Sequence, residues 1–150
     1  FGQGGAVWER FGHNALRILD TATGEDVAWN WGTFDFAQPN FVARFLTGDT
    51  RYWLDGADAD RLARAYAEQL NRSVWLQELA LTDAQKAALQ EYVRWNAQEE
   101  HRYYRYDYYN DNCSTRVRDA LDRVTGGALR RALALRATPE TWRSHTRRLV

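Results

Sequence analysis

Several residue types and sequence patterns are rare or missing in this sequence, and each absence rules out a structural feature or a class of function. Its 150 residues include no methionine, one cysteine and one lysine. A single cysteine excludes an intrachain disulfide, so cysteine usage does not reveal the redox compartment. No apolar run reaches about 18 residues, so no segment is predicted to span a membrane. Because a start methionine is missing, we expect the chain to be a processed or excised piece of a longer protein.

An excess of charge of one sign is also missing. The 20 basic residues are balanced by 20 acidic residues. A broad nucleic-acid-binding surface needs a basic excess, so no nucleic-acid partner is expected. The length is typical of one domain with one hydrophobic core, which we place over residues 1–150.

Short alternating segments and amphipathic segments succeed one another along the chain. The patterns predict five strands, at 13–19, 26–31, 50–54, 74–81 and 103–109. They predict helices at 41–46, 58–70, 82–100 and 113–124, and further short helices in the tail from Ala128 onward. The first two strands form a hairpin whose turn uses Gly24. The expected fold class is α+β, an antiparallel sheet packed with helices.

Two of the predicted helices begin at recognisable caps. Thr82 and Gln85 have the spacing of a capping box. Asn112 or Asp111 precedes the helix that begins at Cys113 and can accept a hydrogen bond from a free backbone N–H.

The position of the only cysteine is the strongest functional signal. A helix N-terminus stabilises an anion, so a thiol at this place tends toward the reactive thiolate. A single cysteine in a helix is more often a buried small hydrophobic residue. The residues around Cys113 are all polar, however, and this is an unusual setting for a core cysteine. We therefore interpret Cys113 as a candidate nucleophile.

A histidine 100 positions upstream supplies a candidate base. His13 opens the first predicted strand, and a cysteine with a distant histidine is the minimum apparatus of a thiol nucleophile. In the predicted hairpin, Asn30 falls within about two residues of the position opposite His13, so its amide can orient the imidazole. The backbone N–H groups of Cys113 and Ser114 are candidates for an oxyanion hole.

Polar and aromatic residues near the cysteine are candidates for substrate binding. Arg116 can pair with an anionic group, or with a nearby aspartate on its own helix. Asn112, Tyr109 and Trp31 complete this candidate set, since the aromatic segments 31–36 and 103–109 can line an apolar groove for an acyl chain. Core filling is the alternative for these aromatic residues.

No metal or cofactor is expected. His101 and His145 lie in charged surroundings, and no pair of histidines has the short spacing of zinc ligands.

The order of the two candidate catalytic residues is itself informative. In papain-like proteins the cysteine helix precedes the histidine strand, whereas here histidine comes first. This reversal predicts a circularly permuted papain-like arrangement.

Four ordered motifs resemble the Lnb-type N-terminal periplasmic domain family. They lie at 11–17 (FGHNALR), 29–36 (WNWGTFDF), 71–74 (NRSV) and 111–119 (DNCSTRVRD). The resemblance implies a permuted papain-like fold similar to NlpC-type hydrolases and lecithin–retinol acyltransferase. It also implies that Cys113 is the nucleophile, His13 the base and Asn30 their neighbour.

The same resemblance gives expectations about location and partners. The family's domain typically faces the outside of the bacterial inner membrane and precedes transmembrane helices. Its best-known members move an acyl chain of a lipoprotein onto an amine. We therefore expect thiol-dependent acyl transfer in the periplasm, with an acylated lipoprotein or another lipid as substrate. A cell-wall peptide hydrolase with the same dyad and a non-catalytic binding domain remain open as alternatives.

Overall fold

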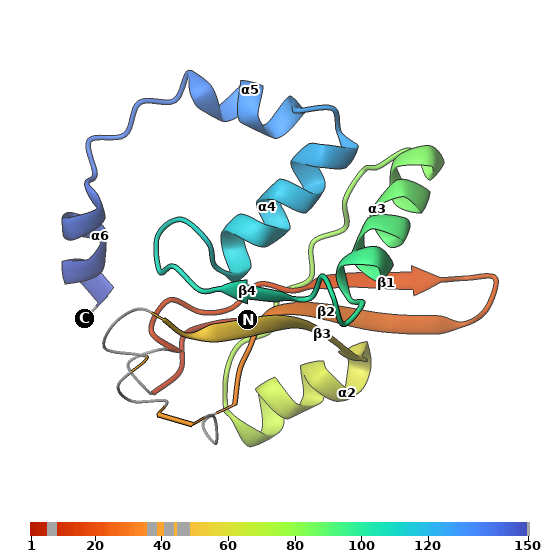
Figure 1. Cartoon of the computed structure of the whole chain (residues 1–150), viewed down its shortest axis with the longest axis horizontal. Helices are drawn as coiled ribbons and strands as arrows, with labels where there is room; N and C mark the ends of the chain where they lie inside the picture. Colours follow the sequence, from red (N-terminus) through yellow and green to blue (C-terminus); the bar gives the residue numbers. More distant parts are fainter. Residues whose placement is uncertain (6–8, 36–38, 41–43, 45–48, 150) are drawn as a thin grey trace.

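An antiparallel sheet divides the molecule into two helical layers (Figure 1). The computed structural model describes residues 1–5, 9–35, 39–40, 44 and 49–149. Its four strands follow one another across the sheet in chain order. They are β1 (Leu16–Asp20), β2 (Glu25–Thr33), β3 (Arg51–Asp58) and β4 (Tyr103–Arg105). The predicted α+β class, with an antiparallel sheet and packed helices, is confirmed.

The first two strands form the predicted hairpin. Leu16 pairs with Trp29 and Asp20 with Glu25. Gly24 closes the turn with a φ of +75°, a conformation that glycine adopts without steric cost. The predicted turn and register therefore agree with the structure.

The helices lie on both faces of the sheet, with α2 on one side and α3 and α4 on the other (Figure 1). Their bounds are α2 Ala59–Arg64, which continues as the π-helix η2 Ala65–Gln69, then α3 Asp83–Asn96, α4 Cys113–Val124, α5 Ala128–Ala134 and α6 Trp142–Leu149. Thr82 and Gln85 form the predicted capping box at the start of α3. The predicted short helix at 41–46 falls largely outside the described residues.

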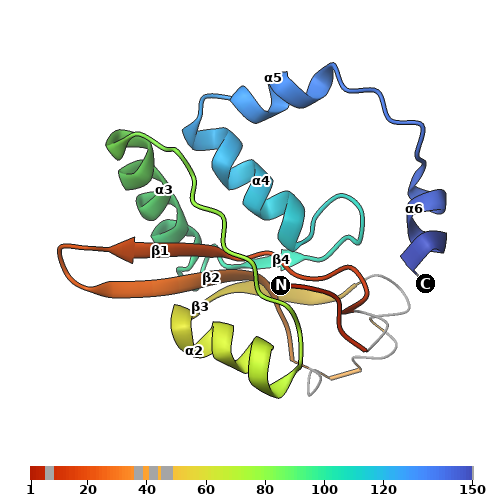
Figure 2. The same ribbon diagram turned by 180° about the vertical axis from the view of Figure 1, so that it is seen from behind.

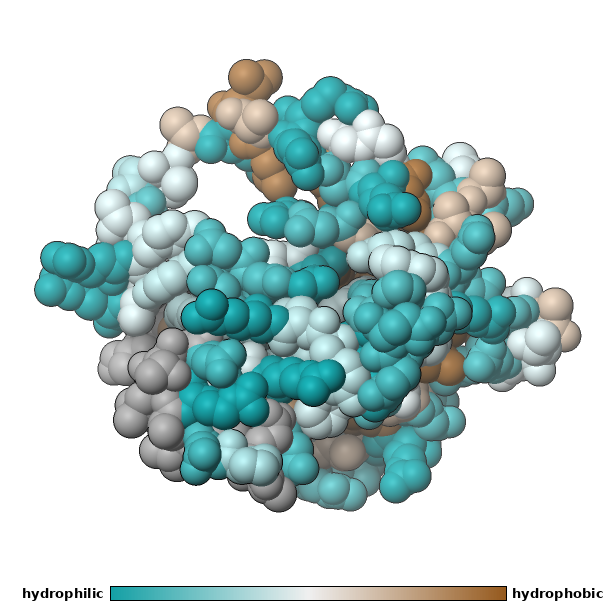
Figure 3. All heavy atoms as spheres, in the orientation of Figure 1, coloured by the Kyte–Doolittle hydropathy of each residue, from teal (hydrophilic) through white to brown (hydrophobic). Residues whose placement is uncertain are grey.

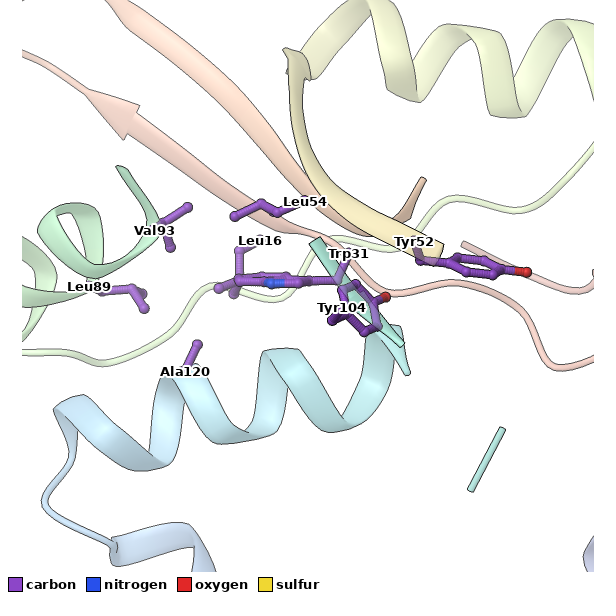
Figure 4. Close-up of a cluster of buried hydrophobic side chains, with 8 residues drawn as sticks. All are labelled: Leu16, Trp31, Tyr52, Leu54, Leu89, Val93, Tyr104 and Ala120. Carbon is purple, nitrogen blue, oxygen red and sulfur yellow. The ribbon is translucent and has the colours of Figure 1, made fainter. Parts of the chain in front are cut away.

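The core lies between the sheet and the α3–α4 layer (Figure 4). It consists of Leu16, Trp31, Tyr52, Leu54, Leu89, Val93, Tyr104 and Ala120. Trp31 is fully buried at its centre, and its indole N–H donates to Oδ1 of Asn96 on α3 at 2.9 Å. This hydrogen bond satisfies the one polar atom that a buried indole brings into a core.

The strand predicted at 74–81 is wrong. This segment has no ladder partner in the described part of the chain, and Trp75 and Leu76 are each 71 % exposed. Figure 2 shows the chain passing here from the α2 layer to the α3 layer. A segment that connects two layers past the sheet has no neighbouring strand to pair with, whatever its β-propensity.

The strand predicted at 103–109 is too long, because β4 ends at Arg105. The Asp107 side chain accepts hydrogen bonds from the N–H groups of Tyr109 and Asn110, which forms a turn. Side-chain bonding of this kind competes with a strand ladder and ends it.

Most of the face in Figure 3 is hydrophilic, and one of its hydrophobic groups lies over α5. Leu135, at the end of this helix, is 93 % exposed. Further along, α6 contacts the loop before α4, where the Tyr109 hydroxyl lies 2.9 Å from Oγ1 of Thr146. The Tyr109 ring also packs on Trp142, with centroids 5.1 Å apart.

Candidate active site

Cys113 is the first residue of α4, and Asn112 is its cap. Oδ1 of Asn112 accepts from the N–H groups of Ser114 and Thr115, at 2.9 and 3.1 Å. The Thr115 hydroxyl oxygen accepts from the Asn112 N–H at 2.8 Å, which completes a capping box. Of the two candidate caps, Asn112 and Asp111, the structure uses Asn112.

The Cys113 thiol is partly buried and electrostatically activated. Burial raises its pKa, but a hydrogen bond and charge from His13 lower it, as do the Asn14 backbone N–H and the Ser114 side chain, and the net shift of the pKa is downward. The partial positive charge of a helix start acts in the same direction. The thiolate is therefore more populated near neutral pH than it is for an ordinary cysteine.

His13 lies in the segment just before β1, beside the cysteine. Its Nε2 is 3.1 Å from Oδ1 of Asn30, and Nδ2 of Asn30 donates to the Ala28 carbonyl at 2.9 Å. Because the amide nitrogen is committed to Ala28, Oδ1 faces the ring and accepts from an Nε2–H. This tautomer leaves Nδ1 as the nitrogen able to receive a proton. The predicted neighbourhood of His13 and Asn30 is present in the structure.

Asn14 links the histidine segment to the helix that carries the cysteine. Its Nδ2 donates to Oγ of Ser114 at 2.8 Å, across 100 positions of sequence. Its backbone N–H also hydrogen-bonds the Cys113 sulfur. One residue thus fixes the start of α4 relative to His13 and stabilises the thiolate directly.

Gly32 is a part of the site that sequence reasoning missed. A Cβ built on it would lie 3.8 Å from both Cβ of Cys113 and Cε1 of His13. Its φ is +112°, at the irregularity where β2 shifts register against β3. This backbone conformation strongly favours glycine. The glycine in the Asn30-Trp31-Gly32 motif was the available signal, since it lets backbone approach the two candidate catalytic side chains.

Aromatic rings lie beside His13. Tyr66 and Phe1 stack with centroids 3.9 Å apart, and both rings are nearly parallel to the imidazole. The backbones of Phe1 and His13 exchange two hydrogen bonds, at 2.9 and 3.0 Å. Buried Arg72 packs over Tyr66 and donates to the Gly2 carbonyl at 2.8 Å. These contacts hold the imidazole plane in place.

The two N–H groups predicted to form an oxyanion hole differ in their hydrogen bonds. The Ser114 N–H is occupied by Oδ1 of Asn112, because Asn112 is the helix cap. The Cys113 N–H, in contrast, has no hydrogen-bond partner among the described residues. It therefore remains available to bind a carbonyl oxygen at the sulfur.

The four residues predicted to bind substrate have other contacts. Trp31 is a core residue with no exposed surface, so its predicted place in a substrate groove is wrong. Asn112 uses its side chain for the cap and for the Tyr108 carbonyl. Arg116 makes a two-pronged ion pair with Asp111. Tyr109 contacts α6.

A small crevice of about 90 Å³ reaches His13 and Asn14. Polar and apolar atoms contribute about equally to its wall, and the apolar part includes four alanines and two exposed residues of the connecting segment, Trp75 and Leu76. Apolar surface next to a candidate base is suited to a nonpolar group of a substrate.

The family model of the Lnb N-terminal periplasmic domain matches residues 1–148. The chain belongs to this family. The suspected relationship is thus confirmed, and the Lnb-type domain is periplasmic, as expected. No curated protein and no solved structure matches the chain.

Two features are absent from the described residues of this Lnb-type domain. None of their helices combines the length and the hydropathy that a membrane crossing requires. Nor do they contain a cluster of three or more histidine, cysteine, aspartate or glutamate side chains placed to hold a metal ion.

Proposed function

We propose that this periplasmic domain catalyses thiol-dependent acyl transfer, with Cys113 as nucleophile, His13 as base and Asn30 orienting the base. The main support is the arrangement around the sulfur. A thiol with a lowered pKa sits at a helix start, hydrogen-bonded to a histidine whose other nitrogen is fixed by an amide. A nucleophile, a base and a third group that orients the base are the diagnostic parts of covalent catalysis.

The first half-reaction forms a thioester. Nδ1 of His13 takes the proton from Sγ of Cys113, and the sulfur attacks the carbonyl carbon of an ester. The carbonyl oxygen becomes an oxyanion, which the Cys113 N–H and the positive end of α4 stabilise. When the C–O bond breaks, His13 returns the proton to the leaving alcohol. The acyl group is then bound to sulfur.

The second half-reaction releases the acyl group. An amine attacks the thioester carbonyl, His13 takes a proton from its nitrogen, and Cys113 leaves as a thiolate that regains the proton. The product is an amide when an amine is the acceptor and a carboxylic acid when water is. An acylated lipoprotein or another lipid ester fits this chemistry, and the apolar part of the crevice beside His13 gives its nonpolar portion a place to bind.

The order of the elements also relates this fold to the papain-like fold. Histidine precedes cysteine in the chain, and the cysteine begins a helix packed on an antiparallel sheet. These features support a circularly permuted papain-like arrangement, with the segment that leads into the sheet supplying the base and the helix the nucleophile.

Alkylation of Cys113 by iodoacetamide as a function of pH tests the dyad directly. In the parent chain we expect the rate to reach its plateau below the ordinary thiol pKa of about 8.5, because the thiolate is stabilised. In His13→Ala we expect the apparent pKa to rise, because the hydrogen bond and the charge that lower it are gone. His101→Ala is the matched control, since His101 stacks on Trp95 instead.

The alkylation experiment and an acylation assay distinguish acyl transfer from hydrolysis and from a non-catalytic binding role. An ordinary pKa that is indifferent to His13 would contradict the proposal and favour a non-catalytic binding domain. If the dyad is present, incubation with p-nitrophenyl butyrate and an added primary amine distinguishes transfer from hydrolysis. Amide formation supports acyl transfer, whereas formation of butyrate alone supports a hydrolase.

A further inference from the structure

A buried tyrosine hydroxyl near the thiol has no hydrogen-bond partner in the described part of the chain. Tyr104 lies on β4, is 8 % exposed and pairs with Tyr52 across the sheet. Its Oη is fully buried without a partner among the described residues. Burying a hydroxyl without a hydrogen bond is unfavourable, so such a group calls for an explanation.

The Tyr104 ring is held firmly. The Arg116 guanidinium stacks on it at 4.3 Å, and Nη2 of Arg116 donates to the Asp111 carboxylate at 2.6 Å. Figure 4 shows Tyr104 above the start of α4, where Cys113 is located. The hydroxyl therefore has a fixed position at the helix end that carries the nucleophile.

The environment also keeps this hydroxyl protonated. Burial raises the pKa of Tyr104 most, and the negative charge of the Cys113 thiolate raises it further. Arg116 acts in the opposite direction and is outweighed. The raised pKa of Tyr104 favours its protonated form, an O–H donor, while the lowered pKa of Cys113 favours the thiolate.

The proposed reaction lacks a second oxyanion donor, and Tyr104 can supply it. The Asn112 cap occupies the N–H groups of Ser114 and Thr115, which leaves the Cys113 N–H alone. Oxyanion holes usually combine more than one donor directed at the developing charge. A protonated hydroxyl without a partner, near the same sulfur, meets that need.

We propose that the Tyr104 hydroxyl donates a hydrogen bond to the acyl carbonyl oxygen while the Cys113 thioester forms and breaks down. The inference rests on the proposed function, because it needs an acyl group on Cys113. No proton is transferred in this step. The O–H bond stays intact while the oxyanion forms and collapses, and the hydrogen bond is strongest when the oxygen carries the charge.

Tyr104→Phe removes only the oxygen, and Tyr52→Phe is the matched control. Tyr52 is the cross-strand neighbour of Tyr104 and equally buried, and burial is the one cause that raises its pKa. Each variant is treated with two reagents, p-nitrophenyl butyrate and iodoacetamide. Acylation by the ester passes through an oxyanion, whereas alkylation does not. The ratio of the two rates therefore isolates stabilisation of the oxyanion from reactivity of the thiolate.

We expect the acylation-to-alkylation ratio to fall about 100-fold in Tyr104→Phe and to stay at the parent value in Tyr52→Phe. We also expect an undiminished melting temperature in Tyr104→Phe, since no hydrogen bond is lost. An unchanged ratio, or an equal fall of both rates, would overturn the role of Tyr104 and leave the proposed function standing. A parent chain that is alkylated but never acylated would overturn both.

A chromophoric acyl group gives a second measurement. A cinnamoyl thioester absorbs at longer wavelength when hydrogen bonds polarise its carbonyl. With Cys113 loaded from cinnamoyl imidazole, we expect the absorption of Tyr104→Phe to move to shorter wavelength than that of the parent and of Tyr52→Phe. An identical spectrum in all three proteins would contradict the hydrogen bond.

Discussion

Two helices of this domain begin with the same local device, but only one of them begins in a candidate active site. Both α3 and α4 have a capping box, formed by Thr82 with Gln85 and by Asn112 with Thr115. At α3 the first helical residue is Asp83, an exposed carboxylate. At α4 it is Cys113, and the first turn has no acidic residue. The anion that benefits from the helix start is thus a surface carboxylate in one case and a thiolate in the other.

The residues packed against the starts of α3 and α4 also differ. His13, Asn14 and Gly32 of the strand layer converge on the start of α4. In the same part of α3, Lys86 of the helix itself reaches Asp83 at 3.3 Å. The start of a helix therefore stabilises a negative charge by itself. A candidate base and a candidate substrate site are present only where the fold packs other residues against that helix start.

The sharpest way to test this comparison is to move the cysteine. In the double variant Asp83→Cys, Cys113→Ala, the thiol again occupies the first position of a capped helix. We expect its acylation by p-nitrophenyl butyrate to be about a thousandfold slower than that of Cys113, because no positioned base is present. The measurement is the rate of p-nitrophenol release, with alkylation confirming that the new thiol is accessible. Equal acylation rates would show that a helix start alone is sufficient.

A side chain at Gly32 is expected to separate the base from the nucleophile. In Gly32→Val, we expect acylation of Cys113 to fall about 100-fold, because added atoms between His13 and Cys113 disturb near-attack geometry. We also expect a loss of about 1–3 kcal/mol of stability from strain at a positive φ. Both quantities are measured on the purified variant, by ester turnover and by urea unfolding.

Gly24→Val controls for the backbone strain. Gly24 also has a positive φ, but a Cβ there would meet no atom within 4 Å. We expect similar destabilisation and unchanged acylation in this variant. If Gly24→Val slowed acylation as much as Gly32→Val, the proximity of Gly32 to the two side chains would not explain the effect.

The smallest expected effects come from the two caps. Thr82→Ala and Asn112→Ala should each cost about 1 kcal/mol of stability, because each removes a side-chain acceptor from the first turn. Only Asn112→Ala should also slow alkylation of Cys113, by about threefold, since fraying of α4 weakens the thiolate stabilisation at its start. Equal alkylation rates in the two variants would mean that the position of the thiol does not depend on its cap.

The parts of this molecule that sequence patterns predicted are those decided by neighbouring residues. The Thr82 box, the Asn112 cap and the turn at Gly24 need only a few consecutive residues, and all are present. The proximity of Asn30 to His13 was also predictable, because a hairpin relates its two strands by a simple register.

The errors concern long-range placement. Alternation predicted a strand through Trp31, but it could not tell which aromatic residues enter the core and which reach a surface. The Ser114 N–H was predicted to be free. The sequence indicates that a cap is present, but it does not indicate which backbone N–H groups the cap binds. Tyr104 was one of five tyrosines at 103–109, and nothing local distinguishes a buried hydroxyl near the sulfur from the others. These features depend on how α4 packs on β4.

The hydrogen bond between Asn14 and Ser114 has a consequence for the biogenesis of the protein. It joins residues 100 positions apart, and a contact of such sequence separation carries a large loop-closure entropy cost that local contacts do not. Until the N-terminal segment docks on α4, the newly made or partly unfolded chain has a cysteine without its histidine. The low pKa of the Cys113 thiol is thus a property of the folded chain alone, because the groups that lower it reach the sulfur only when the two segments pack together.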